Sequence, residues 1–434
     1  MKKVLIITYY WIPSGGAGVQ RWVKFCKYLR ETGWEPIIYT PSNPEYPSED
    51  YSFEKDIPQG VQIVKTPIWE PYNIYRFFAG MRGKKIQAGF ISENKKMGWK
   101  DKLSIRLRGN LLIPDPRRFW VNPSVSFLRR FLREHPVDAI VTTGPPHSMH
   151  LIVMKLKRYF PKLPWVADFR DPWTNIDFYK ELGLTCWADR IHHRLEKQVV
   201  QCADAVVVVS SGMKTEFELL QPSKMHIIPN GYDEEDVTIC NAKPDLHFSI
   251  SHIGTLNAAR NPLVLWKALS QLCSEDATFS NDLQIQLIGK VDFSVIESLH
   301  ACGLARQIHK IDYLPHNEAI VKQQSSQVLL LLINRTANAK GILTGKFFEY
   351  LASGRPVLGI GPVDGDAAEI LNQTGAGNMV GFDDLAAAIA VIREWYALYK
   401  ADRLKLKAES VVRFSRRNLT HELSNLLNQL NTNA

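Results

Sequence analysis

Three charged residues stand together where an apolar run of the sequence ends. Asp168, Arg170 and Asp171 follow residues 165–167, in the segment Asp-Phe-Arg-Asp-Pro-Trp. Packing gives no reason for three charges at the end of a buried strand. The residue types therefore indicate a polar pocket that binds sugar hydroxyls or accepts a proton, and a mutually paired Asp/Arg cluster is the structural alternative.

A glycine-rich loop follows the first apolar run and precedes a segment with helical spacing. Its glycines, Gly15, Gly16 and Gly18, let the backbone approach a ligand, and the N-terminus of the following helix favours an anion. A simple tight turn is the alternative. Arg21 stands where the fingerprint G-x-G-x-x-G requires its third glycine, which argues against an NAD-type site.

The two histidines in residues 147–150 follow another strand end, but a lone histidine is more often structural than catalytic.

The most specific segment of the second half is residues 341–359. Thr344 is predicted to cap a helix there, and the free N–H groups of the first turn of this helix would face a phosphate. Glu349 lies mid-helix, where its carboxylate could accept both hydroxyls of a ribose, with a solvated glutamate as the alternative. Arg260 opens an earlier helix and can clamp a diphosphate, whereas an ordinary surface arginine explains the same pattern.

The elements that must position these residues alternate short apolar runs with amphipathic segments, twice over. We predict strands at residues 4–9, 36–40, 61–66, 139–143, 165–168 and 205–210, and a second series at 248–253, 284–288, 307–311, 328–333 and 357–360. Continuous apolar strands suit parallel sheets that are covered on both faces. The pattern predicts an α/β protein of two doubly wound, Rossmann-like domains that face a cleft, with ligands at the carboxyl ends of the strands.

The predicted domain boundaries follow from a polar, acidic stretch at residues 231–245. The first domain spans residues 1–235, with residues 70–125 as a basic insertion that carries short helices. The second domain spans residues 246–400. Residues 401–434 form a C-terminal helical segment that we expect to pack back on the first domain.

Length and composition agree with two or three ordinary globular domains. The chain has 434 residues, of which 45% are apolar and 22% are charged, and this excludes a disordered or collagen-like chain. No run approaches the roughly 18 apolar residues of a membrane-spanning helix, and the short apolar run near the start does not fit a signal peptide. The six cysteines form no C-x-x-C pair, so we expect reduced, mostly buried thiols in a cytosolic protein.

Positive charge is concentrated in one segment. Between Arg76 and Arg133 the chain has 15 basic and three acidic residues, with Trp99, Phe119 and Trp120 interleaved. Because each basic residue near anionic lipid contributes about 1 kcal/mol, the segment indicates a surface that docks on a membrane. Nucleic acid ranks below a membrane, since no helix-turn-helix, RNA-recognition or zinc signature accompanies the charge. A solvated surface is the third interpretation.

Several of these motifs together are similar to those of one enzyme family. The chain resembles the nucleotide-sugar-dependent glycosyltransferases of family 4, which have the GT-B fold of two Rossmann-like domains, over nearly its whole length. It is especially similar to bacterial cell-envelope members with Tyr-Tyr-Trp-x-Pro-Ser-Gly-Gly-Ala-Gly-Val-Gln-Arg near the start and Asp-Phe-Arg-Asp-Pro-Trp in mid-domain. The segment Ile-Pro-Asn-Gly-Tyr-Asp from Ile228 matches the family's inter-domain signature, and Glu-Tyr-Leu-Ala-Ser-Gly-Arg-Pro-Val from Glu349 matches its best-known motif.

The resemblance implies roles for individual residues. Gly15 and Gly16 would lie against the donor's phosphates and the transferred sugar. Arg260 stands at the place of the family's second phosphate-binding base. Tyr313 and Leu314 stand where the backbone commonly meets the nucleobase of the donor.

Other positions of the family pattern are changed in this sequence. Glu349 matches the glutamate that holds the donor ribose, but the acidic residue expected eight positions earlier is Gly341. The first phosphate-binding arginine, expected after Gly254, is Thr255. Our hypothesis is that Lys346 supplies the missing positive charge.

We therefore predict retaining, metal-independent transfer of a sugar from a nucleoside diphosphate sugar to an envelope glycan, such as lipopolysaccharide, or to a lipid-linked acceptor. Arg260 and Lys346 would stabilise the diphosphate leaving group. Arg170 or Asp171 replaces the family's cleft histidine, and Asp171 would orient sugar hydroxyls. The remaining predicted donor-binding residues are Gly254, Thr255, Thr344 and Gly345. The donor is a substrate, and we expect no cofactor, no metal and no nucleic-acid partner.

Two other functions stay open at this stage. A nucleotide-sugar epimerase of the same fold would isomerise its donor without an acceptor. A non-catalytic protein would bind a membrane or an envelope-assembly complex, and the changes at Gly341 and Thr255 slightly favour it. We predict a cytoplasmic location and, as a further hypothesis, peripheral attachment to the inner face of the cell membrane.

Overall fold

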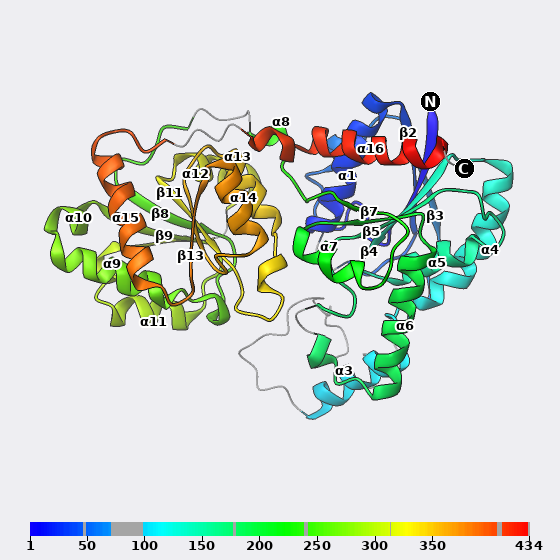
Figure 1. Cartoon of the computed structure of the whole chain (residues 1–434), viewed down its shortest axis with the longest axis horizontal. Helices are drawn as coiled ribbons and strands as arrows, with labels where there is room; N and C mark the ends of the chain where they lie inside the picture. The colour runs from blue at the N-terminus through cyan, green and yellow to red at the C-terminus, as the bar shows by residue number, and fades with distance from the viewer. Residues whose placement is uncertain are drawn as a thin grey trace. The chain divides into compact units, whose positions relative to one another are not determined.

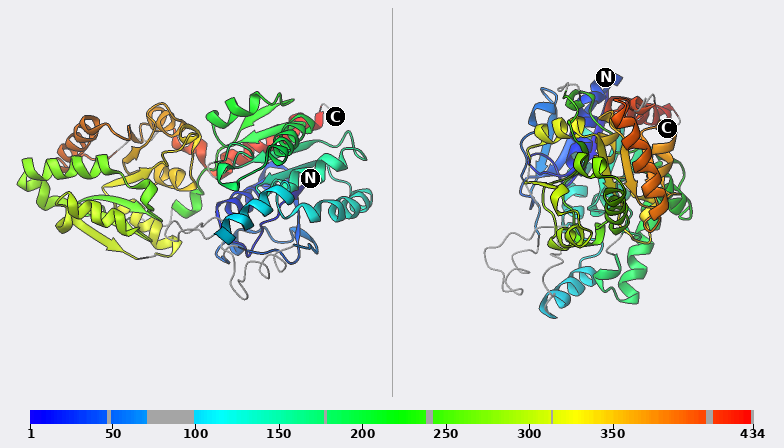
Figure 2. Two further views of the ribbon diagram at one scale, coloured as in Figure 1. Left: turned by 90° about the horizontal axis from the view of Figure 1, so that it is seen from below. Right: turned by 90° about the vertical axis from the view of Figure 1, so that its left-hand side faces the viewer.

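The computed structural model describes residues 1–46, 49–70, 99–176, 179–237, 242–312, 314–405 and 410–432. Within them the chain forms two compact units, and we describe each unit by itself. The first unit consists of Met1–Pro229 and Leu419–Ala434, and the second unit is Asn230–Asn418. Figure 1 shows the elements of the chain, and Figure 2 shows them from two further directions.

In the described residues of the first unit, seven parallel strands form a sheet with the order β3-β2-β1-β4-β5-β6-β7. The strands are β1 (Lys2–Ile7), β2 (Trp34–Pro41), β3 (Gln62–Thr66), β4 (Ala139–Gly144), β5 (Trp165–Phe169), β6 (Ala205–Val208) and β7 (Met225–Ile227). The described helices are α1 (Ala17–Leu29), α3 (Trp99–Leu111), α4 (Arg118–Glu134), α5 (Ser148–Leu156), α6 (Cys186–Cys202), α7 (Ser211–Glu218) and, from Leu419 on, α16 (Arg416–Thr432).

Successive residues of β1 face opposite sides of this sheet. Val4 and Ile6 pack in one core cluster with α1 and α16, whereas Leu5 and Ile7 pack in another with α4, α5 and α7. All four side chains are fully buried. Because helices cover both faces of the sheet (Figure 1), its strands can be continuous apolar runs.

In the described residues of the second unit, six parallel strands form a sheet with the order β10-β9-β8-β11-β12-β13. The strands are β8 (Phe248–Ile253), β9 (Leu283–Ile288), β10 (Ile308–Ile311), β11 (Val328–Leu332), β12 (Val357–Ile360) and β13 (Gly377–Val380). The described helices are α8 (Glu234–Val237), α9 (Leu263–Glu275), α10 (Ala277–Asp282), α11 (Phe293–Ala301), α12 (His316–Ser325), α13 (Gly345–Ala352), α14 (Asp366–Thr374) and α15 (Leu385–Lys400).

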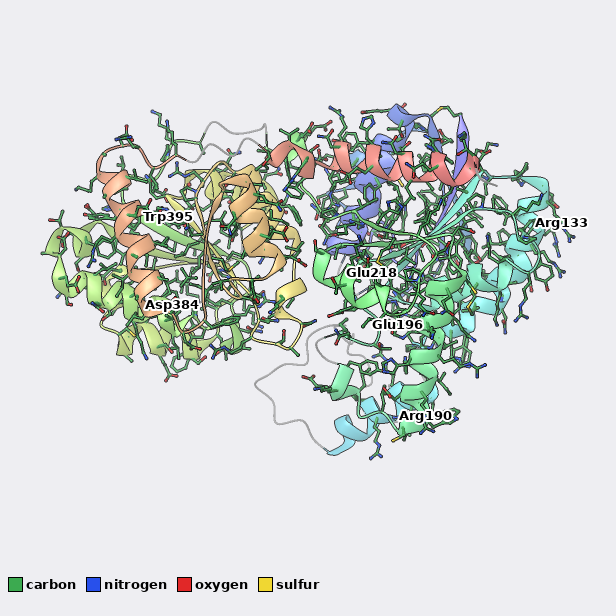
Figure 3. The ribbon with its side chains drawn as sticks, viewed as in Figure 1. Arg133, Arg190, Glu196, Glu218, Asp384 and Trp395 are labelled. Carbon is green, nitrogen blue, oxygen red and sulfur yellow. The ribbon has the colours of Figure 1, made fainter. Side chains whose placement is uncertain are left out.

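The second sheet is also covered on both faces. Leu330 and Leu332 of β11 pack in a cluster with α9 and α15, which includes the buried Trp395 that Figure 3 labels. Leu329 and Leu331 pack on the other face, in a cluster with α13 and α14. Alternate residues of one apolar strand thus build two separate core layers.

Counted from the start of each unit, both sheets have the doubly wound strand order 3-2-1-4-5-6, to which the first unit adds β7 at an edge. The strand order reverses between β1 and β4 and between β8 and β11, where such folds bind ligands. The predicted fold class is therefore confirmed. The sequence analysis missed the edge strands β7 and β13, which are only three and four residues long and are not continuous apolar runs.

The prediction of mostly buried cysteines is wrong for the described residues. Cys26 is buried, but Cys186 and Cys202 are exposed, and Cys273 and Cys302 are partly exposed. Cys186 and Cys202 are the first and last residues of α6, and both lie outside the packed face of this helix. The described thiols are free, as predicted.

The basic insertion is described only in part, because residues 71–98 lie outside the described residues. Its described aromatic residues differ in burial. Trp120 is buried and stacks on Tyr39 with ring centroids 4.8 Å apart, whereas Phe119 is exposed and packs edge-to-face on the exposed Trp69. Among the described helices, none combines the length and the apolar character that crossing a bilayer requires.

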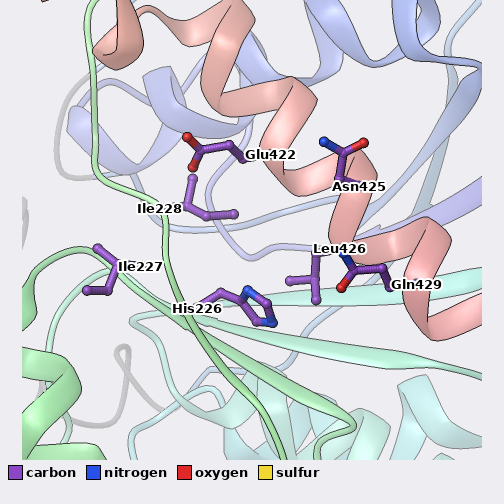
Figure 4. A pocket seen from close by; sticks show the side chains of 7 residues that line it. All are labelled: His226, Ile227, Ile228, Glu422, Asn425, Leu426 and Gln429. Atoms are coloured by element: carbon purple, nitrogen blue, oxygen red, sulfur yellow. The ribbon is translucent and has the colours of Figure 1, made fainter. Parts of the chain in front are cut away.

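A small pocket of about 210 Å³ lies beside β7 in the first unit (Figure 4). It is lined by His226, Ile227 and Ile228 on one side, and on the other by residues of α16: Glu422, Asn425, Leu426 and Gln429. None of the predicted site residues lines this pocket.

Candidate active site

Asp168, at the end of β5, is a buried structural carboxylate. It accepts hydrogen bonds from Arg21 Nε and Nη2 at 3.3 and 2.9 Å, from Trp22 Nε1 at 2.8 Å and from Thr143 Oγ1 at 3.0 Å. A carboxylate has about four acceptor positions, so this one has no oxygen lone pair left for a ligand. For Asp168 the functional interpretation is therefore wrong, and the paired Asp/Arg cluster is what the structure shows.

Arg21 explains why the glycine-rich loop lacks a third glycine. Its guanidinium is fully buried and also donates to the carbonyl oxygens of Ile228 and Pro229, at 2.9 and 2.7 Å. In dinucleotide-binding folds, the third glycine lets the helix lie close to the strand. Here helix α1 uses that position to tie β5 to the chain segment that ends the first unit.

Arg170, directly after β5, reaches the glycine-rich loop. Its Nη2 donates to Pro145 O at 2.7 Å, and its backbone N–H donates to Gly144 O at 3.2 Å. The guanidinium lies on the Cα atom of Gly18, because a Cβ atom built there would overlap Nη1. Burial lowers the pKa of Arg170, and the nearby Asp171 partly offsets this shift. The side chain of Asp171 itself is exposed.

The glycine-rich loop leads directly into the N-terminus of α1. Gly16 precedes α1 with φ 112°, a conformation that favours glycine, and Gly15 is buried. Helix α1 has neither a side-chain cap nor an acidic residue in its first turn. Its N-terminus therefore keeps the positive end of the helix dipole uncompensated.

His147 and His150 belong to an aromatic cluster. His150 is fully buried and stacks on Phe169 at 4.4 Å, and His147 stacks on Trp173 at 4.8 Å. Burial lowers the pKa of His150 to about 3. Glu196, labelled on α6 in Figure 3, holds the adjoining segment through Thr174 Oγ1 at 2.5 Å. Both imidazoles are thus neutral packing groups, in agreement with the structural alternative.

In the second unit, Lys346 reaches the end of β8. A Cβ atom built on Gly254, which has φ 124°, would overlap the Nζ atom of Lys346. Thr255, the next residue, carries no charge, and the ammonium group comes instead from the first turn of α13. The structure thus brings a cation to the strand end where the family pattern expects its first phosphate-binding arginine.

The surroundings of Lys346 disfavour its charged form. Burial lowers the pKa of Lys346, Arg260 lowers it further, and Glu349 acts in the opposite direction. In the described part of the chain, Lys346 forms no ion pair with a carboxylate. His252 of β8 is buried, and this burial lowers its pKa to about 4, so it is neutral and donates from Nδ1 to Leu330 O at 3.1 Å.

Asn334 positions Arg260 and was missed by the sequence analysis. Arg260 ends a short 3-10 turn, Ala258–Arg260, and its Nε donates to Asn334 Oδ1 at 2.5 Å. Asn334 follows β11, and β8 and β11 flank the reversal of strand order. A polar residue just after a predicted strand was the available signal.

Among the described residues, Glu349 has one hydrogen-bond partner. Its Oε2 accepts from Gln323 Nε2 of α12 at 3.1 Å, which leaves Oε1 for a ligand. Tyr350, next to it, accepts a hydrogen bond from the backbone N–H of Ile253 at 3.1 Å, so that α13 is fixed against β8. Thr344 takes the N-cap position of α13, but its side chain makes no capping hydrogen bond. The prediction that the Thr344 hydroxyl caps this helix is therefore wrong.

The other predicted donor residues are placed only in part. Gly345 is the first residue of α13, with open space where a Cβ atom would lie. Leu314 is partly buried and packs against the core cluster of α13 and α14. Tyr313 lies outside the described residues.

The chain contains a segment that matches a known family. Residues 90–236 match the family described as Glycosyltransferase Family 4. The predicted resemblance to family 4 is thereby confirmed. No curated protein sequence matches the chain.

Several solved structures share the fold of this chain over nearly its whole length. Sucrose-phosphate synthase from Thermosynechococcus elongatus has a TM-score of 0.62 at 14% identity and covers 100% of both chains. HepE from Anabaena, in complex with UDP-glucose, has a TM-score of 0.57 at 13% identity, with 99% of this chain and 100% of that chain covered. WaaG, a glycosyltransferase involved in lipopolysaccharide biosynthesis, has a TM-score of 0.55 at 12% identity, with 98% of this chain and 99% of that chain covered. These likenesses confirm the GT-B fold.

Gln323 donates the hydrogen bond that orients Glu349. Replacing Gln323 tests whether the carboxylate of Glu349 needs a fixed orientation. We expect Gln323→Ala to raise KM for the nucleotide-sugar donor about fivefold to tenfold with little change in kcat, because one hydrogen bond to a charged group is lost. Steady-state kinetics with varied donor measures this. Gln271→Ala, at an exposed position of α9, is the control. An unchanged KM in the Gln323 variant would contradict the positioning role.

The pH dependence of catalysis should reveal the buried ammonium of Lys346. Since burial lowers the pKa of Lys346 below the ordinary 10.5, the charged form disappears earlier as the pH rises. We expect kcat/KM, which reports the free enzyme, to fall on an alkaline limb below pH 10.5. Lys346→Arg should remove this limb, because arginine stays charged. A limb that persists in that variant would assign the titration to another group.

Proposed function

We propose that this chain is a glycosyltransferase that moves a sugar from a nucleoside diphosphate sugar to an envelope glycan or a lipid-linked acceptor. The family 4 match over residues 90–236 and the GT-B fold support glycosyl transfer. The observation that carries the proposal lies in the second unit. Lys346, Arg260 and the N-terminus of α13 gather at the strand ends, and Glu349 has a free carboxylate oxygen.

This arrangement suits a diphosphate leaving group. Arg260 and Lys346 provide two positive charges, which equals the number of phosphates in the donor's diphosphate. Neither cation has to be recruited during the reaction, because Asn334 orients Arg260 and packing on Gly254 places Lys346. Preorganised charge of this kind stabilises the transition state more than the ground state. Glu349 Oε1 would bind the ribose of the donor.

The reaction that we propose retains the anomeric configuration and needs no metal or cofactor. The acceptor hydroxyl oxygen attacks the anomeric carbon on the side of the leaving group. The bond between this carbon and the diphosphate oxygen breaks, and the acceptor proton passes to a phosphate oxygen. Gly15 and Gly16 would lie against the sugar, and Asp171 would orient its hydroxyls.

The donor class and the cellular setting are part of the proposal. HepE, which shares the fold, was solved with UDP-glucose, and WaaG is involved in lipopolysaccharide biosynthesis. By analogy we propose a UDP-sugar donor and an envelope acceptor for this chain. Its basic insertion would attach the protein peripherally to an anionic membrane surface in the cytoplasm, and nucleic acid is not a partner.

Nucleotide binding is the direct test. We expect that UDP binds more tightly than GDP, ADP or CMP in isothermal titration and that Glu349→Ala weakens this binding at least tenfold. Glu394→Ala, at an exposed position of α15, should change nothing. Product analysis with UDP-glucose then separates the functions. Transfer to an envelope glycan supports the proposal, an isomerised donor without acceptor indicates an epimerase, and binding without any turnover indicates a non-catalytic protein.

A further inference from the structure

We propose that the pocket between β7 and α16 (Figure 4) is a carbohydrate-binding site that holds one sugar residue. The inference goes beyond the proposed function, because the pocket contains none of the residues assigned to the transfer reaction. The class of ligand follows from the volume of the pocket, its free polar groups and its apolar surface.

The two walls of the pocket belong to the same unit and are fixed against each other. The residues that α16 contributes are spaced at i, i+3, i+4 and i+7, so they share one face of the helix, which lies opposite β7. Ile228, from the wall formed by β7, and Leu426, from the helix, pack in one buried core cluster. The pocket is therefore formed before any ligand binds.

Two side chains of the pocket have unused hydrogen-bonding groups. Among the described residues, neither His226 nor Asn425 has a hydrogen-bond partner for its side chain. Burial lowers the pKa of His226, and the positive charges of Lys224 and Lys214 lower it further. The imidazole is therefore neutral at pH 7 and offers one donor and one acceptor, while the amide of Asn425 offers two donors and an acceptor oxygen.

The backbone of β7 adds a further donor and acceptor. In the described part of the first unit, β7 is the last strand of the sheet, and no strand pairs with its outer edge. Val206 N–H donates to Lys224 O, and Ile228 N–H donates to Val208 O, so the even-numbered residues here turn their backbone groups toward β6. The N–H and C=O of Ile227, which also lines the pocket, therefore point toward the open edge.

This combination of groups suits a sugar. A sugar ring carries hydroxyl groups, which both donate and accept, along its edge, and it has C–H groups on its faces. The pocket matches the hydroxyls with neutral donors and acceptors, and it matches the faces with the side chains of Ile227, Ile228 and Leu426. Its volume of about 210 Å³ is below the roughly 300–1,000 Å³ of sites for drug-sized ligands, so it suits one sugar ring better than a nucleotide.

Other classes of ligand fit the pocket less well. The carboxylate of Glu422, which lines it, disfavours an anion. Among the described residues, no group of three or more His, Cys, Asp and Glu side chains is placed to hold a metal ion. With three residues, β7 offers an extended peptide few backbone groups, and short edge strands are a means by which proteins avoid such pairing.

Saturation-transfer difference NMR on the full-length protein tests the site. The probes are D-glucose, D-galactose, D-mannose and N-acetyl-D-glucosamine, each titrated alone and without nucleotide. We expect at least one of the four sugars to bind. Inorganic phosphate and trialanine, added as competitors, should not displace the bound sugar.

Two substitutions locate the bound sugar. Asn425→Leu and His226→Leu each remove free hydrogen-bonding groups and keep a side chain of similar size. Each should raise the Kd for the sugar about threefold or more, because a hydrogen bond to the ligand is lost. Gln201→Leu, at an exposed position of α6 outside the pocket, is the control and should leave this Kd unchanged. An unchanged midpoint of urea unfolding shows that each variant is folded.

The carbohydrate site and the proposed function fail in different ways. If none of the four sugars binds, or if the Kd is unchanged in both pocket variants, the carbohydrate site is overturned. Displacement of the sugar by phosphate or by trialanine overturns it as well, in favour of an anion or a peptide. The titration with UDP tests the proposed function separately, because the NMR experiment contains no nucleotide.

Discussion

Replacing Lys346 by methionine is expected to lower kcat by about 10²- to 10³-fold, which is the usual effect of removing one preorganised group from a developing negative charge. Methionine keeps most of the aliphatic volume but removes the ammonium that lies on Gly254. Thr255, the residue after Gly254, has no charge and cannot replace this ammonium. KM for the donor should rise less, because the ammonium stabilises the leaving diphosphate more than the intact donor.

The measurement is steady-state kinetics with a UDP-sugar and an envelope acceptor. Lys267→Met, at an exposed position of α9, is the control for loss of a lysine from a helix of the same unit. Lys346→Arg should keep a substantial part of kcat, because it preserves the charge. If Lys346→Met turns over at the wild-type rate, Lys346 does not stabilise the leaving group, and Arg260 would have to do so alone.

Replacing Asp168 by alanine is expected to destabilise the first unit by about 3–5 kcal/mol, the typical cost of breaking a buried ion pair from one side. Arg21 would then keep a fully buried positive charge, and its remaining hydrogen bonds among the described residues would go to the carbonyl oxygens of Ile228 and Pro229. Trp22 Nε1 and Thr143 Oγ1 would lose their acceptor at the same time. The free energy of unfolding of a folded domain is only about 5–15 kcal/mol. The substitution therefore removes a large part of the stability of the first unit.

Urea unfolding of the first unit, followed by tryptophan fluorescence, measures this loss. Glu181→Ala, at an exposed position of the same unit, should change the free energy of unfolding by less than about 0.5 kcal/mol. The double variant Arg21→Met/Asp168→Leu should be more stable than Asp168→Ala, because it leaves no unpaired charge. A small loss for Asp168→Ala would return Asp168 to the list of ligand-binding candidates.

The sequence by itself determined the fold class and the strand ends at which we expect ligands to bind. Apolar runs such as residues 328–333 and 357–360 can only be buried on both faces, and this requirement specifies parallel sheets between helices. Edge strands escaped detection, because the half-buried residues of β7 do not need a continuous apolar run. The motif around Glu349 placed a helix start and a carboxylate correctly, since both depend on local spacing along one helix.

Only the tertiary structure decided what each charged residue does. Asp168 and Arg170 are two positions apart, yet the carboxylate is paired with Arg21 and Trp22 of α1, whereas the guanidinium donates to the carbonyl oxygen of Pro145. The partners of both lie far away in the sequence, and spacing along the chain contains no information about them. Lys346 likewise becomes a phosphate-binding candidate only because α13 brings it onto Gly254. Local patterns determine elements, whereas burial and long-range contacts determine which charges are paired and which remain for a ligand.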